Sequence, residues 1–117
     1  MPGILSRAFD RFTTEQRDAA DLRDDAERSG CCHIADTVER ERVAIHGVVR
    51  SVTQRSVDGI STLEAELYDG SDSVTLVWLG RRRITGISTG RSLTARGRLG
   101  TRGGRKVIHN PAYELDA

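Results

Sequence analysis

Arginine is the residue type in this sequence with the clearest capacity for binding chemistry. The chain has 117 residues, of which 18 are lysine or arginine and 17 are aspartate or glutamate, and its formal net charge is +1. Lys106 is the single lysine, a scarcity that we attribute to genome composition. A guanidinium group is planar and always charged, and it binds phosphate through paired hydrogen bonds. Arginines that gather on one surface therefore predict a polyanionic partner.

The charges are unevenly distributed along the chain. Residues 1–41 hold six arginines and ten acidic residues, which gives a net charge of −4. Residues 42–117 hold eleven arginines, one lysine and seven acidic residues, which gives a net charge of +5. The sequence therefore predicts an acidic N-terminal part and a basic body that could attract a polyanion.

Two groups of arginines could form the binding surface. The consecutive residues Arg81, Arg82 and Arg83 could contact phosphates. The alternating residues Arg96 and Arg98, on a neighbouring segment, could extend them into one basic strip. The alternative for the consecutive arginines is a solvated connector that only aids solubility.

Aromatic side chains are few, with one tryptophan, two tyrosines and two phenylalanines. A base that stacks on an aromatic ring contributes about 1–3 kcal/mol. Trp78 alternates in phase with Val74 and Leu76, which places it in the core, whereas Tyr68 is in the outward phase. Tyr68 is thus the better stacking candidate, and affinity would depend mainly on electrostatics and hence on salt.

No arrangement of residues predicts catalysis. The sequence lacks HExxH and GxxxxGK[ST], and its glycine-rich segment GRLGTRGGR is typical of a hairpin turn. His46 and His109 have no acidic or cysteine neighbour at ligand spacing. Cys31 and Cys32 are adjacent, a spacing that disfavours both a disulfide and a zinc site, although metal or redox chemistry there is the alternative. We therefore expect a protein that is not an enzyme and holds no metal or cofactor.

From Val43 onward, apolar and polar residues alternate with the two-residue period of β-strands. We expect five strands, at residues 42–52, 63–68, 73–79, 92–100 and 105–110. Gly47 inside the first strand predicts a bulge or a sharp bend, and Pro111 ends the fifth strand. The expected core residues are Val43, Ile45, Leu67, Leu76, Leu93 and Leu99.

Five short strands without room for crossover helices predict a small closed barrel, because closure removes the exposed edges of a sheet. The longest interruption, residues 80–91, falls between the third and fourth strands. In an oligonucleotide/oligosaccharide-binding barrel (OB-fold), a helix or loop at this place plugs the barrel bottom. An SH3-like barrel, the main alternative, has its long excursion after the first strand. The predicted fold class is all-β, a five-stranded antiparallel OB-fold barrel with an N-terminal helical extension.

The N-terminal part reads as helical. Apolar residues at helical spacing predict a first helix at residues 4–12, and a second at residues 15–29 would end at Gly30. We therefore divide the chain into a helical extension, residues 1–33, and a barrel domain, residues 34–117. No apolar run approaches the roughly 18 residues that cross a membrane, and the N-terminus does not resemble a secretory signal, so the expected compartment is the cytoplasm.

Two segments of the chain resemble known sequences. IADTVERERVAIHGVVRSV, residues 34–52, resembles the opening of bacterial nucleic-acid-binding OB domains, and LEAELYDGSDSVTLVWL, residues 63–79, resembles their second hairpin. Similar sequences occur in the anticodon-binding barrels of class II aminoacyl-tRNA synthetases and in the wedge domain of a branched-DNA helicase. Over residues 20–115 the chain looks closest to small stand-alone actinobacterial proteins described as OB-fold nucleic-acid-binding.

The resemblance implies a binding face across the second and third strands and the loops beside it. The residues that it nominates are Tyr68, Thr75 and Val77 on the face and Arg55, Arg102 and Arg105 in the loops. Glu64 and Glu66 depart from the family pattern, because they direct negative charge outward from the second strand. They could instead contact base donors or a protein partner.

Two functions from different classes follow from these observations. The first is a non-catalytic module that binds single-stranded DNA or RNA, or tRNA-like loops, through arginines and loops around the second and third strands. The alternative is a protein-interaction module that docks a partner through the acidic N-terminal helices. The arginines favour the first function, and the two outward glutamates favour the second.

Overall fold

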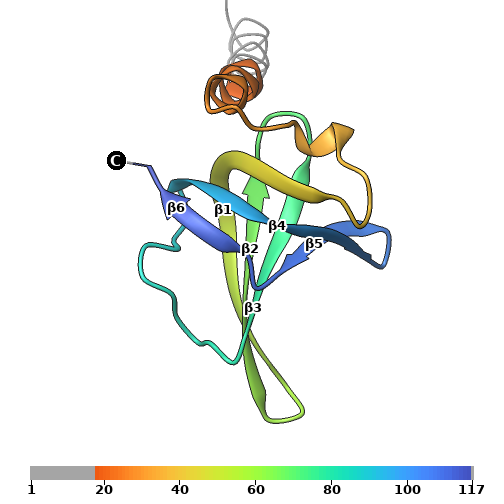
Figure 1. Ribbon diagram of the computed structural model, residues 1–117. Coiled ribbons are helices and arrows are strands. Elements are labelled where there is room, and N and C mark those ends of the chain that lie inside the picture. The colour runs from red at the N-terminus through yellow and green to blue at the C-terminus, as the bar shows by residue number, and fades with distance from the viewer. Residues whose placement is uncertain (1–17, 117) are drawn as a thin grey trace, which may run out of the picture.

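The computed structural model describes residues 18–116, and most of them belong to strands (Figure 1). The six strands are β1 Arg42–Val57, β2 Ile60–Tyr68, β3 Ser73–Leu79, β4 Ser92–Arg102, β5 Arg105–His109 and β6 Ala112–Leu115. An α-helix at residues 18–28 and the 3-10 helix η1, Ile34–Asp36, precede them. All five expected strands are present, and β6 is an additional strand that the sequence did not predict.

The strands form a closed ring. They pair in the order β1-β2-β3-β5-β4-β6, and β1 also pairs with β4, so that β6 alone lies outside the ring. All pairings are antiparallel except that of β3 with β5, which is parallel. The expectation of a fully antiparallel ring is therefore wrong at this pairing. The reason is that β5 returns from β4 by a tight turn and inserts between β4 and β3, where it runs in the direction of β3.

Strand β1 belongs to both sides of the ring because it bends. Its first half, from Arg42 to Val48, pairs with β4, and its second half pairs with β2. At the bend, a Cβ atom on Gly47 would lie 2.5 Å from the carbonyl oxygen of Tyr68, so only glycine fits without movement. A register shift follows just after the bend, within the next few residues. The predicted bend at Gly47 is thus confirmed.

The interior of the ring is one apolar cluster, and it contains every core residue expected from the sequence: Val43, Ile45, Leu67, Leu76, Leu93 and Leu99. Trp78 is buried as well, and its indole nitrogen donates a hydrogen bond to the carbonyl of Pro111 at 3.2 Å. Ile84 and Ile87, in the connector between β3 and β4, are buried in the same cluster. This connector, which contains no helical residues, therefore closes the end of the ring at which β3 ends.

Polar groups close the other end, where η1 meets the turn between β2 and β3. The carboxylate of Asp69 is fully buried and accepts hydrogen bonds from the backbone nitrogens of Ile34, at 2.8 Å, and Ser71, at 2.9 Å. The ammonium of Lys106 donates to the carbonyl oxygens of Ile34, at 2.6 Å, and Thr37, at 3.2 Å. Because each charged group has several partners, its burial is compensated.

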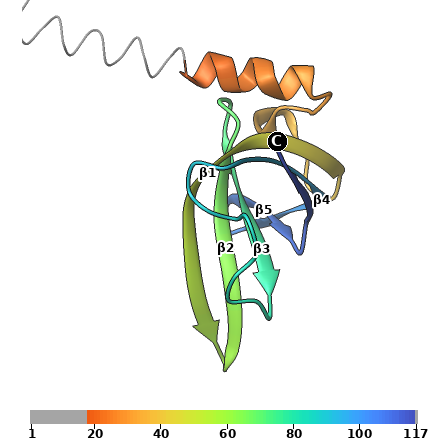
Figure 2. The ribbon, with the colours of Figure 1, turned by 90° about the vertical axis from the view of Figure 1, so that its left-hand side faces the viewer.

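The helix at residues 18–28 lies across this end of the ring and above the turn between β2 and β3 (Figure 2). A Cβ atom on Gly70 would lie only 2.1 Å from the carbonyl oxygen of Ala19, and a guanidinium nitrogen of Arg23 donates to the carbonyl of Gly70 at 3.0 Å. The helix ends before Gly30, whose φ of 73° is left-handed, as expected. The helix expected at residues 4–12 lies outside the described residues. None of the helices that the structure describes is long and apolar enough to cross a membrane.

Candidate nucleic-acid interface

Glu64 lies between two of the predicted arginines on the outer face of β2. Its Oε1 accepts a hydrogen bond from Arg102 at 3.0 Å, and its Oε2 lies 3.7 Å from Nε of Arg55. The side chain of Glu64 is 11% exposed, whereas those of Arg55 and Arg102 are 59% and 51% exposed. Two arginines expected to contact phosphate are thus bound to a carboxylate of the chain itself.

The contact between Glu64 and Arg102 spans the face that was predicted to bind a ligand. Strands β3 and β5 separate β4, which carries Arg102, from β2, which carries Glu64. Val77 and Val107 point outward from these intervening strands, yet they are only 1% and 2% exposed. The expectation that Val77 is available to a ligand is therefore not met, because long side chains can cover an outward residue.

Tyr68 is half-buried at the end of β2, and one face of its ring is already in contact with a cation. The guanidinium carbon of Arg50 lies 4.1 Å from the ring centroid, and Nη1 of Arg50 lies 4.0 Å from Oε1 of Glu66. A cation over an aromatic face is attracted by its quadrupole. A base can stack on Tyr68 only from the other face or by displacing Arg50. Sequence reasoning missed Arg50, because it falls in the bulge between Val49 and Ser51, where alternation fails.

Thr75 and Arg105, both nominated from the sequence, come together in a groove beside the turn between β4 and β5. The groove has a volume of about 430 Å³ and is lined by Glu66, Asp72, Ser73, Thr75, Gly104, Arg105 and Lys106. It therefore presents both hydrogen-bond acceptors and donors. Base edges carry donors and acceptors, whereas phosphate only accepts, so this lining suits a base more than a phosphate.

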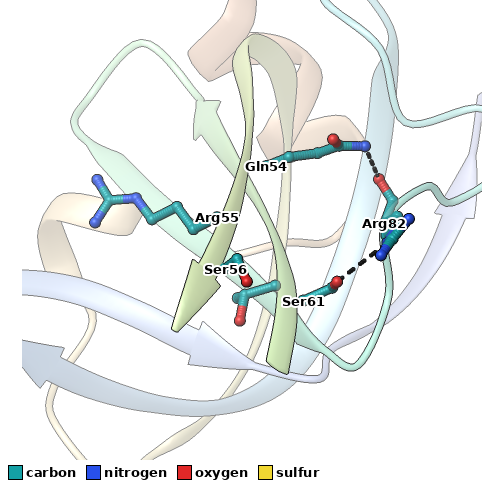
Figure 3. A pocket seen from close by; sticks show the side chains of 6 residues that line it. Gln54, Arg55, Ser56, Ser61 and Arg82 are labelled. Atoms are coloured by element: carbon teal, nitrogen blue, oxygen red, sulfur yellow. Dashed lines mark hydrogen bonds between the residues drawn. The ribbon is translucent and has the colours of Figure 1, made fainter. Parts of the chain in front are cut away.

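A second groove, at the hairpin of β1 and β2, contains Arg82. It has a volume of about 290 Å³ and is lined by Gln54, Arg55, Ser56, Ser61, Thr62 and Arg82. Nε of Arg82 donates to the hydroxyl of Ser61 at 3.2 Å, and the amide of Gln54 donates to the carbonyl of Arg82 (Figure 3). Arg55 points away from Gln54 and Arg82, because successive side chains of a strand alternate. Arg82 therefore lies on the opposite side of the hairpin from Arg55.

Arg96 and Arg98 project from the outer face of β4, beside β1. Arg98 is the register partner of Arg42, and its Nη1 donates to the carbonyl of Arg40 at 3.4 Å. The side chains of these four arginines, at positions 40, 42, 96 and 98, are exposed. Within residues 18–116 none of them has a carboxylate oxygen within 4.0 Å. Sequence reasoning missed Arg42, although the inward phase of Val43 already implied that Arg42 points outward.

The predicted arginines do not form one strip on neighbouring strands. Strand β5 lies between β3, which leads into the connector, and β4. The connector residues Arg81, Arg82 and Arg83 are exposed beyond the end of β3. The structure thus places arginines in separate groups: one around Glu64, one in the connector and one on β4 and β1.

The cysteines and histidines form no catalytic arrangement among the described residues. Burial raises the pKa of the Cys31 thiol, against the opposing effect of the nearby Arg96, and this makes the reactive thiolate scarcer. His46 is buried, and its Nε2 lies 2.7 Å from a carboxylate oxygen of Asp116. Over residues 18–116, no group of three or more histidine, cysteine, aspartate or glutamate side chains is placed to hold a metal ion.

Comparison with known proteins relates the fold to that of a protein solved with nucleic acid. No family model and no curated protein sequence matches the chain. Among solved structures, the chain is similar to RecG bound to a three-way DNA junction, with a TM-score of 0.61 and 24% sequence identity. The matched region covers 73% of this chain but only 12% of the RecG chain. The similarity shows a shared fold with a small part of RecG.

Proposed function

We propose that the chain is a non-catalytic nucleic-acid-binding module with an OB-fold, and that it binds single-stranded DNA or RNA. The similarity to part of RecG, a protein solved with DNA, is the observation that carries this proposal. The closed ring of five strands, with the connector 80–91 in its end, supports the fold assignment. In this proposal residues 34–117 are the binding domain and residues 1–33 are an extension.

The arginines divide into those that are available to phosphate and those that are not. In the described part of the chain, the acid-paired arginines are Arg50, Arg55 and Arg102. The nominated arginines that have no such partner among residues 18–116 are Arg81, Arg82, Arg83, Arg96, Arg98 and Arg105. We therefore assign backbone contacts to Arg81, Arg82, Arg83, Arg96, Arg98 and Arg105. The groove at Thr75 is assigned to bases.

Binding should be measured by fluorescence anisotropy with labelled single- and double-stranded DNA and RNA at two salt concentrations. We expect single strands to bind more tightly. If four or five phosphates are neutralised, the slope of log affinity against log salt is about −3, from about −0.7 per phosphate. An absence of salt-sensitive binding at micromolar concentrations would overturn the proposal.

A protein-interaction function is the second candidate, because the helix at residues 18–28 exposes many acids. These exposed residues are Asp18, Asp21, Asp24, Asp25 and Glu27. A basic protein surface would complement them. Replacing Asp24 and Asp25 with asparagine should then abolish capture of a partner without changing nucleic-acid affinity, whereas equal capture by both forms would remove this candidate.

A further inference from the structure

Around Glu64 the chain has the geometry of an occupied anion site. One carboxylate receives two guanidinium groups, Arg55 from β1 and Arg102 from β4, at 3.7 and 3.0 Å. The two guanidinium groups come from strands on opposite sides of the outer face, since β2, β3 and β5 lie between them. Phosphate and carboxylate accept hydrogen bonds from guanidinium in the same forked geometry. A phosphodiester would therefore use the same donors as Glu64.

We propose that Arg55 and Arg102 form a phosphodiester-binding site that Glu64 occupies in the free protein and yields when a nucleic acid binds. This inference rests on the nucleic-acid-binding function proposed above. It adds two arginines and one competing carboxylate to that function. Glu64 lowers the affinity for nucleic acid, because a nucleic acid that uses the site must first displace the Glu64 side chain.

Displacement is feasible because the arginines face solvent. More than half of each guanidinium side chain is exposed, so an incoming phosphate can reach it while the pair with Glu64 is still formed. Water and salt screen the exposed arginine ends of both pairs, which weakens the pairs, although the Glu64 side chain is itself only 11% exposed. The three side chains together carry a net charge of +1, which one phosphate neutralises.

Replacing the Glu64 carboxylate with an amide tests the proposal. We expect Glu64→Gln to bind labelled oligothymidylate and oligouridylate more tightly than the unmodified chain. The amide spares the cost of displacing Glu64. Where Glu64 still keeps the site closed in complexes of the unmodified chain, one more phosphate contact steepens the salt slope by up to about 0.7, which corresponds to up to about fivefold tighter binding at 0.1 M salt. Glu66→Gln is the matched control, because it removes the same charge from the same face but has only one guanidinium, at 4.0 Å. We expect it to tighten binding less and to steepen the slope less than Glu64→Gln.

A substitution of Arg102 distinguishes a specific phosphate site from a general effect of the changed net charge. Arg102→Ser should weaken binding more in the Glu64→Gln chain than in the unmodified chain, because Glu64 holds Arg102 in the latter. The gain from Glu64→Gln should disappear in the double variant. An equal cost of Arg102→Ser in both chains would overturn the proposal, and so would equal slopes for the two glutamate variants.

These results are distinguishable from a failure of the proposed function. If no chain binds any nucleic acid, the function itself fails and the inference fails with it. If the unmodified chain binds and Glu64→Gln matches Glu66→Gln, only the inference fails. The melting temperatures of the variants should first be shown to be equal. If Arg102→Ser has a lower melting temperature, Arg55→Ser replaces it in the same double-mutant cycle.

Discussion

Arginines lie on two faces of the ring, the outer face of β2 and β3, which they reach from β1 and β4, and the outer face where β1 pairs with β4. Among residues 18–116, only the first face supplies acids for them. On the first face, Glu64 binds Arg55 and Arg102. On the second, Arg42 stands opposite Arg98 in the register, without a carboxylate partner among residues 18–116. Like charges opposite each other destabilise a sheet. The position of an arginine and its availability to a ligand are therefore separate properties.

This difference affects how a nucleic-acid strand would bind to the two faces. On the face that the resemblance nominated, which we call the balanced face, Arg50, Arg55 and Arg102 each have a carboxylate partner, so phosphate gains little there unless a glutamate moves. The face of β1 and β4 is unbalanced, so an approaching polyanion relieves repulsion as well as gaining attraction. Substitutions on each face test whether the two faces differ in this way.

The largest effect should come from breaking the strand that joins the two faces. In Gly47→Ala, the added Cβ meets the carbonyl oxygen of Tyr68 at 2.5 Å, so β1 must shift away from β2. Overpacking of this kind should lower the free energy of unfolding by about 2–3 kcal/mol, measured by urea denaturation. Gly100→Ala is the control, because its Cβ has no neighbour closer than 3.7 Å. Equal stability of the two variants would contradict the assigned role of the bend.

The connector should contribute most to affinity. If each of Arg81, Arg82 and Arg83 neutralises one phosphate, replacing all three with serine weakens single-strand binding about a hundredfold at 0.1 M salt and flattens the salt slope by about 2. The loss should be the same for all sequences. Anisotropy at several salt concentrations measures both quantities. Arg28→Ser, on the helix, serves as the control, and a triple variant with an unchanged slope would remove the connector from the interface.

A smaller effect is expected at Tyr68, on the balanced face. Tyr68→Ala should lose about 1–3 kcal/mol of binding free energy with little change in slope, because stacking releases few counterions. Tyr68→Phe keeps the ring and should bind like the unmodified chain. If the phenylalanine variant binds as weakly as the alanine variant, the hydroxyl rather than the ring makes the contact.

The smallest effect concerns the stability of the unbalanced face. Arg42→Glu places opposite charges across β1 and β4 and should raise the free energy of unfolding by about 0.5 kcal/mol. The same change should weaken nucleic-acid binding, which anisotropy measures in parallel. Arg42→Gln should give intermediate values of both. A decrease in stability for the glutamate variant would show that Arg42 is not repelled by Arg98.

The elements that depend on local pattern could be predicted from the sequence. Alternation of Leu63, Ala65 and Leu67 identified β2 and its inward face, and all three side chains are buried. The same pattern assigned Trp78 to the core correctly. Strand β6 was not predicted, because four residues after a proline carry too little periodicity and their partner, β4, is distant along the chain.

The state of the candidate site could not be predicted, because it depends on long-range contacts. Arg102 reaches Glu64 from 38 positions away, and no spacing rule connects them. Val77 was correctly placed opposite in phase to Trp78, but its burial depends on side chains from other strands. The outward phase of a strand residue is therefore a local property, whereas its exposure is a property of the whole face.

The parallel pairing of β3 and β5 has a consequence for the order of events in folding. It joins Thr75 to Val107, 32 positions later, through three register pairs, whereas the antiparallel pairing of β1 with β4 has seven. Non-local contacts are paid for in chain entropy before they add stability, so a short non-local pairing forms late and opens early. We expect the amide hydrogens of β5 that face β3 to exchange faster than those between β1 and β2. We therefore expect the ring to open first along the pairing of β3 with β5.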